Sequence, residues 1–135
     1  MSRRPQVLSV GELPMPVRAS LADAANDERL GLVAAIEIAR FRKRTGIGPT
    51  FSELFATLER IGSIRLNWEG EADVTFAFRY HIAVHWRRQG WVRWTLSTRS
   101  LATGRTFQAA SAAHRALTRA RNLRASGVDR SAELP

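Results

Sequence analysis

The sequence predicts a mainly helical protein with a small two-stranded sheet. Three segments carry apolar residues at spacings of three and four, which is typical of helices with one buried face. In residues 91–94, Trp91 and Arg93 alternate with Val92 and Trp94, and this period of two is typical of a short strand. Residues 99–102 are a plausible partner strand, so a β-hairpin is expected beside the helices.

The first two core helices are predicted from their end signals. A helix over residues 27–44 has three basic residues in its last turn, where the helix dipole favours them, and it ends before Gly46. A second helix is predicted over residues 51–58. Thr50 precedes Glu53 by three residues, which is the spacing of a capping box.

The third core helix is predicted over residues 73–89. Asp73 is expected to cap its start, and Gly90 is expected to end it in the left-handed conformation. Residues 59–73 form a long connector with a weak pattern. The side chains expected on the buried face of this helix are Phe78, Ile82, Ala83 and Trp86.

The two ends of the chain are expected to lie outside the core. Residues 1–19 hold three of the five prolines and are predicted to form a flexible arm or an edge strand. The folded domain is expected over residues 20–105. A basic C-terminal helix follows over residues 106–125, and residues 126–135 are predicted to be a disordered tail.

Positive charge is concentrated in the second half of the chain. Residues 74–128 contain ten basic residues and no Asp or Glu, whereas residues 1–73 contain ten residues of each sign. Twenty of the 21 basic residues are arginine, whose guanidinium group matches phosphate and guanine in bidentate geometry. A segregated net charge of +9 favours a nucleic acid partner over a purely solubilising role.

The order of these elements is that of a winged helix-turn-helix domain, with three core helices, a two-stranded wing and an additional C-terminal helix. The segment Gly48-Pro-Thr-Phe-Ser-Glu-Leu54 resembles the start of the second helix in LexA-like and related bacterial repressor domains. The segment Trp86-Arg-Arg-Gln-Gly-Trp-Val-Arg93 is similar to the end of their recognition helix and the beginning of the wing. The long connector over residues 59–73 departs from the short turn of that family.

The resemblance implies a sequence-specific, double-stranded DNA-binding transcriptional regulator whose third helix enters the major groove. The residues that it places nearest the bases are Thr75, Arg79 and Tyr80, with Phe76 beside them. Those that it places on phosphates or in the wing are Arg87, Arg88, Arg93, Arg99 and Arg105. The alternatives are an architectural or accessory DNA-binding factor in a replication, partition or phage assembly, and a winged-helix adaptor for protein interaction.

Other classes of function have little support in the sequence. The chain has no cysteine, which excludes a thiolate zinc site and a cysteine nucleophile. His81 and His85 have the spacing of a metal-binding pair but no nearby carboxylate completes the set, so no metal and no cofactor are expected. No serine lies in a nucleophile elbow and no glycine-rich loop has nucleotide-binding spacing, so we expect no catalytic residues and no enzyme activity.

The tryptophans and the last helix allow more than one interpretation of their contacts. The cluster of Trp86, Trp91 and Trp94 could stack on unpaired bases or bind an aromatic ligand, but core positions or a dimer contact are favoured. Trp86 and Trp91 flank a helix end and are expected to pack inward, whereas Trp94 has the better chance of exposure. An alanine-rich face of the last helix suits close packing in a homodimer. No apolar run approaches the length of a membrane span, so a cytoplasmic, nucleoid-associated protein without membrane contact is expected.

Overall fold

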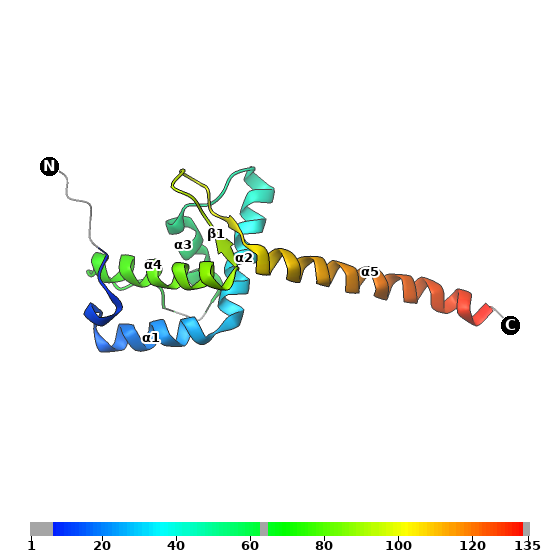
Figure 1. The fold of residues 1–135 in the computed structure, drawn as a ribbon, viewed down its shortest axis with the longest axis horizontal. Coiled ribbons are helices and arrows are strands. Elements are labelled where there is room, and N and C mark those ends of the chain that lie inside the picture. The colour runs from blue at the N-terminus through cyan, green and yellow to red at the C-terminus, as the bar shows by residue number, and fades with distance from the viewer. Residues whose placement is uncertain (1–6, 63–64, 134–135) are drawn as a thin grey trace.

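The computed structural model describes residues 7–62 and 65–133, with the side chains of the last helix described as far as Ala125. The described residues form five α-helices and one antiparallel two-stranded sheet (Figure 1). The elements are a short 3-10 helix (Val10–Glu12), α1 (Met15–Asn26), α2 (Glu28–Thr45), α3 (Phe51–Ile61), α4 (Ala72–Gln89), β1 (Val92–Arg93), β2 (Ala102–Thr103) and α5 (Arg105–Glu133). The predicted combination of helices with a small sheet is confirmed.

The N-terminal segment packs on the core. Helix α1 begins directly after Pro14 and has Pro16 in its first turn. Proline is tolerated there because the first N–H groups of a helix have no intrahelical acceptor. Val17 is buried, as is the rest of one face of α1. This corrects the flexible arm or edge strand predicted over residues 1–19, of which residues 1–6 lie outside the described part.

The capping signals of α2 and α3 are confirmed. The Asp27 carboxylate accepts a hydrogen bond from the backbone N–H of Arg29 at 3.0 Å, so it caps α2. The Thr50 hydroxyl accepts from the N–H of Glu53 at 3.1 Å, and the Glu53 carboxylate accepts from the N–H of Thr50 at 2.9 Å. These bonds satisfy donors that a helix start would otherwise leave unpaired.

The predicted end of α4 is confirmed, but its predicted cap is wrong. Gly90 ends α4 with φ of 84°, a left-handed conformation that glycine adopts without steric cost. The helix starts at Ala72, so Asp73 lies within the first turn and cannot occupy the capping position. Glu71 occupies that position and makes no side-chain capping bond.

Helix α4 is the centre of the core. Its side chains Phe78, Ile82 and Trp86 are fully buried, as predicted. Helix α1 lies beside it on one side, and α3 packs on the other side, where Phe55 stacks on Trp86 with ring centroids 5.7 Å apart (Figure 1). The connector before α4 contributes Leu66 and Trp68 to the same core, and no strand forms in its described residues.

The β-hairpin packs on α2 and on the turn that follows it. Val92 pairs with Thr103 in the antiparallel register. The guanidinium of Arg42 donates to the Leu101 carbonyl oxygen at 2.8 Å. A side chain at Gly48 would bring its Cβ within 2.5 Å of the carbonyl oxygens of Arg99 and Leu101. The hairpin therefore rests directly on the backbone at Gly48.

Helix α5 leaves the core immediately after the hairpin and projects away from it (Figure 1). It runs from Arg105 to Glu133, so the helix continues through residues 126–133, where a disordered tail was predicted; residues 134–135 lie outside the described part. Within the residues that the structure covers, no helix is long and apolar enough to span a membrane.

The close approach at Gly48 predicts a loss of stability in Gly48→Ala. The added methyl group would force two hairpin carbonyls away, and overpacking of this kind costs typically about 1–3 kcal/mol. Urea unfolding measured by circular dichroism checks this. The matched control is Gly11→Ala, because nothing lies within 4 Å of a Cβ at that position. Equal effects of the two substitutions would contradict the close approach.

Candidate functional site

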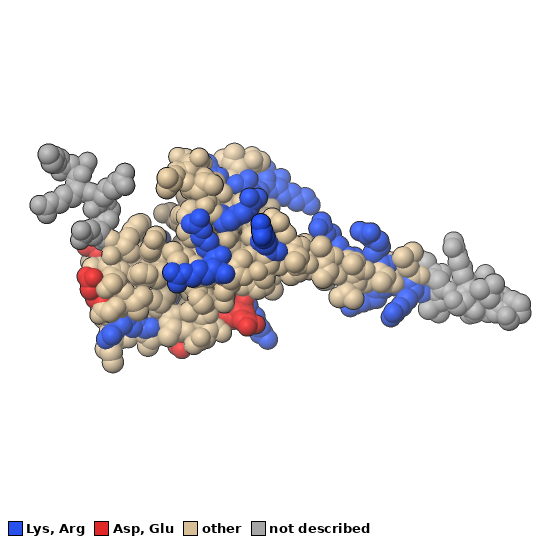
Figure 2. Space-filling model, in the orientation of Figure 1, with Lys and Arg blue, Asp and Glu red and all other residues tan. Residues whose placement is uncertain are grey.

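Basic side chains gather on one part of the molecule. Figure 2 shows Lys and Arg side chains over the hairpin end of the core and along α5, while the Asp and Glu side chains in view lie at other edges. Four arginines of this region, Arg87, Arg88, Arg93 and Arg105, are exposed. Ion pairs in the described residues involve Arg40, Arg79 and Arg99, so these four carry uncompensated charge.

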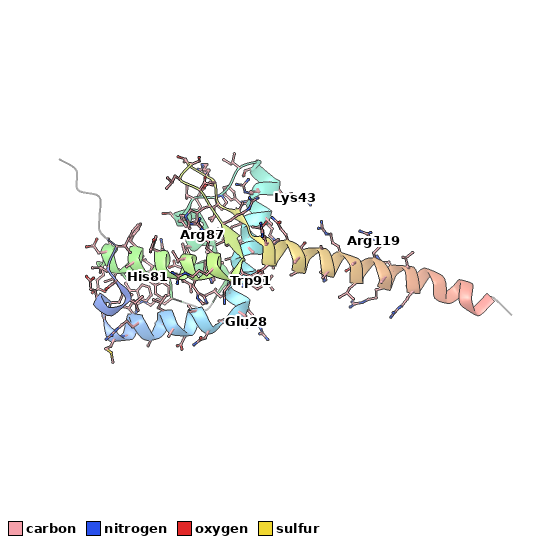
Figure 3. The ribbon with its side chains drawn as sticks, viewed as in Figure 1. Glu28, Lys43, His81, Arg87, Trp91 and Arg119 are labelled. Atoms are coloured by element: carbon pink, nitrogen blue, oxygen red, sulfur yellow. The ribbon has the colours of Figure 1, made fainter. Side chains whose placement is uncertain are left out.

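Arg87 and Arg93 are oriented by contacts at the hairpin. Arg87, which is labelled in Figure 3, has its guanidinium carbon 4.6 Å from the centroid of the Trp94 ring, a cation–π distance. Arg93 donates from Nε to the Thr103 carbonyl oxygen at 3.0 Å, which leaves its terminal nitrogens unused by protein groups. Two guanidinium groups are thereby held at the surface around β1.

Thr75 does not lie at the surface where the resemblance placed it. It is 8% exposed, and its hydroxyl accepts a hydrogen bond from the N–H of Trp68 at 2.8 Å. The hydroxyl also lies 3.2 Å from the Trp68 carbonyl oxygen. Thr75 therefore fixes the connector on α4 and has no free group for a ligand.

Arg79 is likewise engaged inside the protein. Its Nε donates to the Leu66 carbonyl oxygen at 2.9 Å, and its terminal nitrogen lies 3.6 Å from the Glu59 carboxylate. Its guanidinium carbon is 5.3 Å from the centroid of the Phe55 ring. These contacts hold the connector against α3 and α4, so they give Arg79 a structural role.

Arg99 joins the hairpin to the start of α3. Its terminal nitrogen lies 2.9 Å from the Glu53 carboxylate and 3.3 Å from the Gly48 carbonyl oxygen. Its backbone φ is 57°, an uncommon value for a residue with a side chain. Of the residues predicted for the wing, Arg99 is thus partly neutralised and Arg105 is not.

The exposed face of α4 is aromatic in its first half. Phe76 and Tyr80 are 51% and 46% exposed, and they lie four residues apart on the same side of the helix. Neither carries a charge, and Tyr80 alone offers a polar group. Tyr80 is the predicted base-contacting residue that does lie at the surface.

These aromatic rings line a groove of about 750 Å³ between α3, α4 and the hairpin. Trp94 forms its hairpin wall and meets Phe51 of α3 edge to face, with centroids 5.2 Å apart. The residues around the groove are Phe51, Ser52, Phe55, Asn67, Trp68, Glu69, Gly70, Ala72, Thr75, Phe76, Arg79, Tyr80, Ala83 and Trp94. A surface of this kind favours apolar or aromatic ligand groups.

No sequence pattern predicted this groove. Aromatic residues in helical segments, such as Phe51, are normally core residues, and Phe76 was expected near the bases only through the resemblance. One signal was available: Phe76 and Tyr80 fall on the side of α4 opposite to Phe78 and Ile82. A helix with apolar residues on two faces buries both only if both are packed against other groups, and the core of this protein packs against one of them.

The tryptophans and histidines lie mainly in structural positions. Trp86 is buried and Trp91 is half-buried, with its indole ring over Gly31. The Nε2 atoms of His81 and His85 lie 2.7 Å from the Leu8 carbonyl oxygen and 2.8 Å from the Ala25 carbonyl oxygen (Figure 3). Among the described residues there is no cluster of three metal-ligating side chains.

The Glu53 contacts predict a pH-dependent stability. Hydrogen bonds from Thr50 hold the pKa of the Glu53 carboxyl below its ordinary value of 4.5, and the Arg99 guanidinium lowers it further. A depressed pKa stabilises the fold above the unfolded pKa, and this contribution is lost as the pH falls through the folded pKa. The melting temperature should therefore fall less in Glu53→Gln than in the parent protein as the pH drops below 4.5. A constant difference between the two proteins across this range would contradict it.

No protein-family model matches the chain, and no curated protein or solved structure is significantly similar to it.

Proposed function

We propose that the protein binds double-stranded DNA mainly through the phosphate backbone, as an accessory or architectural factor. The observation that carries this proposal is the group of exposed arginines without carboxylate partners at the end of α4, on β1 and at the start of α5. Each phosphate that such a group neutralises releases condensed counterions, which supplies affinity independent of base sequence.

The local architecture is compatible with a winged helix-turn-helix, which we include in the proposal. Helices α2, α3 and α4 are followed by a hairpin, and the turn before α3 lies against that hairpin at Gly48. In this arrangement, α4 and the hairpin would face the duplex. Arg87 and Arg93 lie at their junction, where phosphates of one strand could meet both.

The same geometry favours backbone contact over base readout. Specific readout needs donors and acceptors aimed at base edges. Thr75 and Arg79, which the resemblance placed nearest the bases, use their polar groups within the protein. Phe76 contributes no hydrogen bond. A sequence-specific transcriptional regulator is the second candidate, supported by Tyr80 and Arg87, which are exposed on α4.

The proposal predicts that Arg87→Ala/Arg88→Ala weakens binding to all duplexes alike and makes it less dependent on salt. The slope of log affinity against log salt concentration changes by roughly 0.9 for each phosphate that the protein neutralises, so the slope of the double variant should be smaller by about 2. Fluorescence anisotropy with a labelled duplex at several salt concentrations measures the slope.

The control is Arg29→Ala, which removes one positive charge and is compared with Arg87→Ala and Arg88→Ala as single variants. Arg29 is exposed at the start of α2, next to Glu28, and lies in the half of the chain whose charges balance. It should leave the slope unchanged. An equal loss in this control would show that net charge, and not the proposed surface, determines binding.

Selection from random duplexes at about 150 mM salt, which suppresses non-specific charge contacts, is expected to return shallow sequence preference, because the proposed contacts are directed to the backbone. A strongly enriched motif that disappears in Tyr80→Phe or Arg87→Ala would instead establish the specific regulator. Absence of any duplex binding would overturn both candidate functions.

A further inference from the structure

Two apolar surfaces of this chain lack a partner within the described structure. The first is the aromatic groove, where Phe51, Phe76 and Tyr80 remain 39%, 51% and 46% exposed. The second is α5. None of its side chains from Arg105 to Ala125 is buried. An isolated helix has little stability in water without tertiary contacts. Exposed apolar patches often mark interaction sites, so both surfaces are candidates for contact with a partner.

Helix α5 has a continuous apolar face. Leu117 and Leu123 are 62% and 67% exposed, and small residues lie between and beside them at spacings of three and four. Arg119 and Arg121 flank this face, each four residues from one of the leucines. The residues of the face are Ala113, Ala116, Leu117, Ala120 and Leu123.

The charges of the two surfaces are complementary. Between residues 105 and 125, α5 has five arginines and no Asp or Glu. One end of the groove is lined by Glu69, and the exposed residues Glu71 and Asp73 follow it. A basic helix docked in the groove would place its arginines near these carboxylates.

The start of α5 prevents the helix from reaching the groove of its own core. The N–H of Gly104 donates to the Trp91 carbonyl oxygen, and the N–H of Thr106 to the Gly90 carbonyl oxygen, both at 2.9 Å. The Thr106 hydroxyl also donates to the Gln89 carbonyl oxygen at 2.6 Å. These bonds fix the direction of α5, which projects away from the core (Figure 1).

We infer that α5 of one copy docks by its alanine–leucine face into the aromatic groove of a second copy. A two-fold axis allows both copies to make the same exchange, so both grooves and both helices are covered. The recognition mode is that of an amphipathic helix in an apolar groove. Leu117 and Leu123 are the side chains that would contact the aromatic rings.

Disulfide trapping tests this inference directly, because the natural chain has no cysteine. Ala116→Cys lies on the apolar face of α5 and Ser52→Cys lies at the groove. Mixing the two single variants under mild oxidation should give mainly the mixed disulfide. Asn122→Cys, on the opposite side of α5, is the matched control and should cross-link several times less.

Each other outcome overturns the inference in a recognisable way. Predominant Ala116→Cys homodimers would mean that two α5 helices pair with each other. A monomer mass for the natural chain in light scattering at about 100 µM would exclude the dimer at concentrations where interfaces of this kind form. Quenching of tryptophan fluorescence by single-stranded DNA, lost in Phe76→Ala, would mean that unpaired bases occupy the groove.

Substitutions on α5 supply a second test that leaves the core intact. Leu117→Glu/Leu123→Glu should convert the dimer to a monomer, because it places two charges against aromatic rings. Thr118→Glu/Asn122→Glu introduces the same charge on the opposite side of the helix and should remain dimeric. Equal behaviour of the two variants would contradict docking through the leucine face.

Discussion

The fold depends on the burial of α4 between elements that come from distant parts of the chain. Trp86, Phe78 and Ile82 fill the space between α1 and α3, and polar groups of the same helix bind backbone carbonyls at its margins. His81 reaches the segment before α1 and His85 reaches the end of α1. Because these bonds join α4 to segments more than fifty residues away, they fix the N-terminal part of the fold on the same helix that carries the candidate site.

The burial of α4 also determines which of its arginines remain exposed and able to contact a partner. In its first two turns, polar groups bind the connector: Thr75 holds Trp68, and Arg79 holds Leu66 and pairs with Glu59. At its last turn, the guanidinium groups of Arg87 and Arg88 form no hydrogen bond or ion pair with the part of the chain that the structure describes, and both residues are exposed beside the hairpin. One helix is therefore structural at its beginning and cationic at its end. This asymmetry favours phosphate contacts at the hairpin over base contacts at the helix start.

Sequence patterns were sufficient where structure is local. The capping box at Thr50 and the left-handed Gly90 each involve residues within one turn, so their spacing predicts the bond that forms. The failures involve tertiary context. A helix packed on two sides has no single inner face, so counting from Phe78 could not show that the connector would cover Arg79. The prolines before Val17 suggested a flexible arm, although in a first helical turn they favour a helix start.

Helix α5 adds the last constraint. The core is complete without this helix. The hairpin, the turn at Gly48 and α4 pack on one another, and no described α5 side chain is buried among them. Helix α5 is fixed at Thr106, none of its side chains as far as Ala125 is buried, and it exposes an alanine–leucine face beside arginines. Propensity alone accounts poorly for such a helix, since most helical stability in proteins comes from packing. The proposed docking of α5 on a second copy would supply that packing, and the fixed direction of α5 would let a two-fold dimer form without any rearrangement of the core.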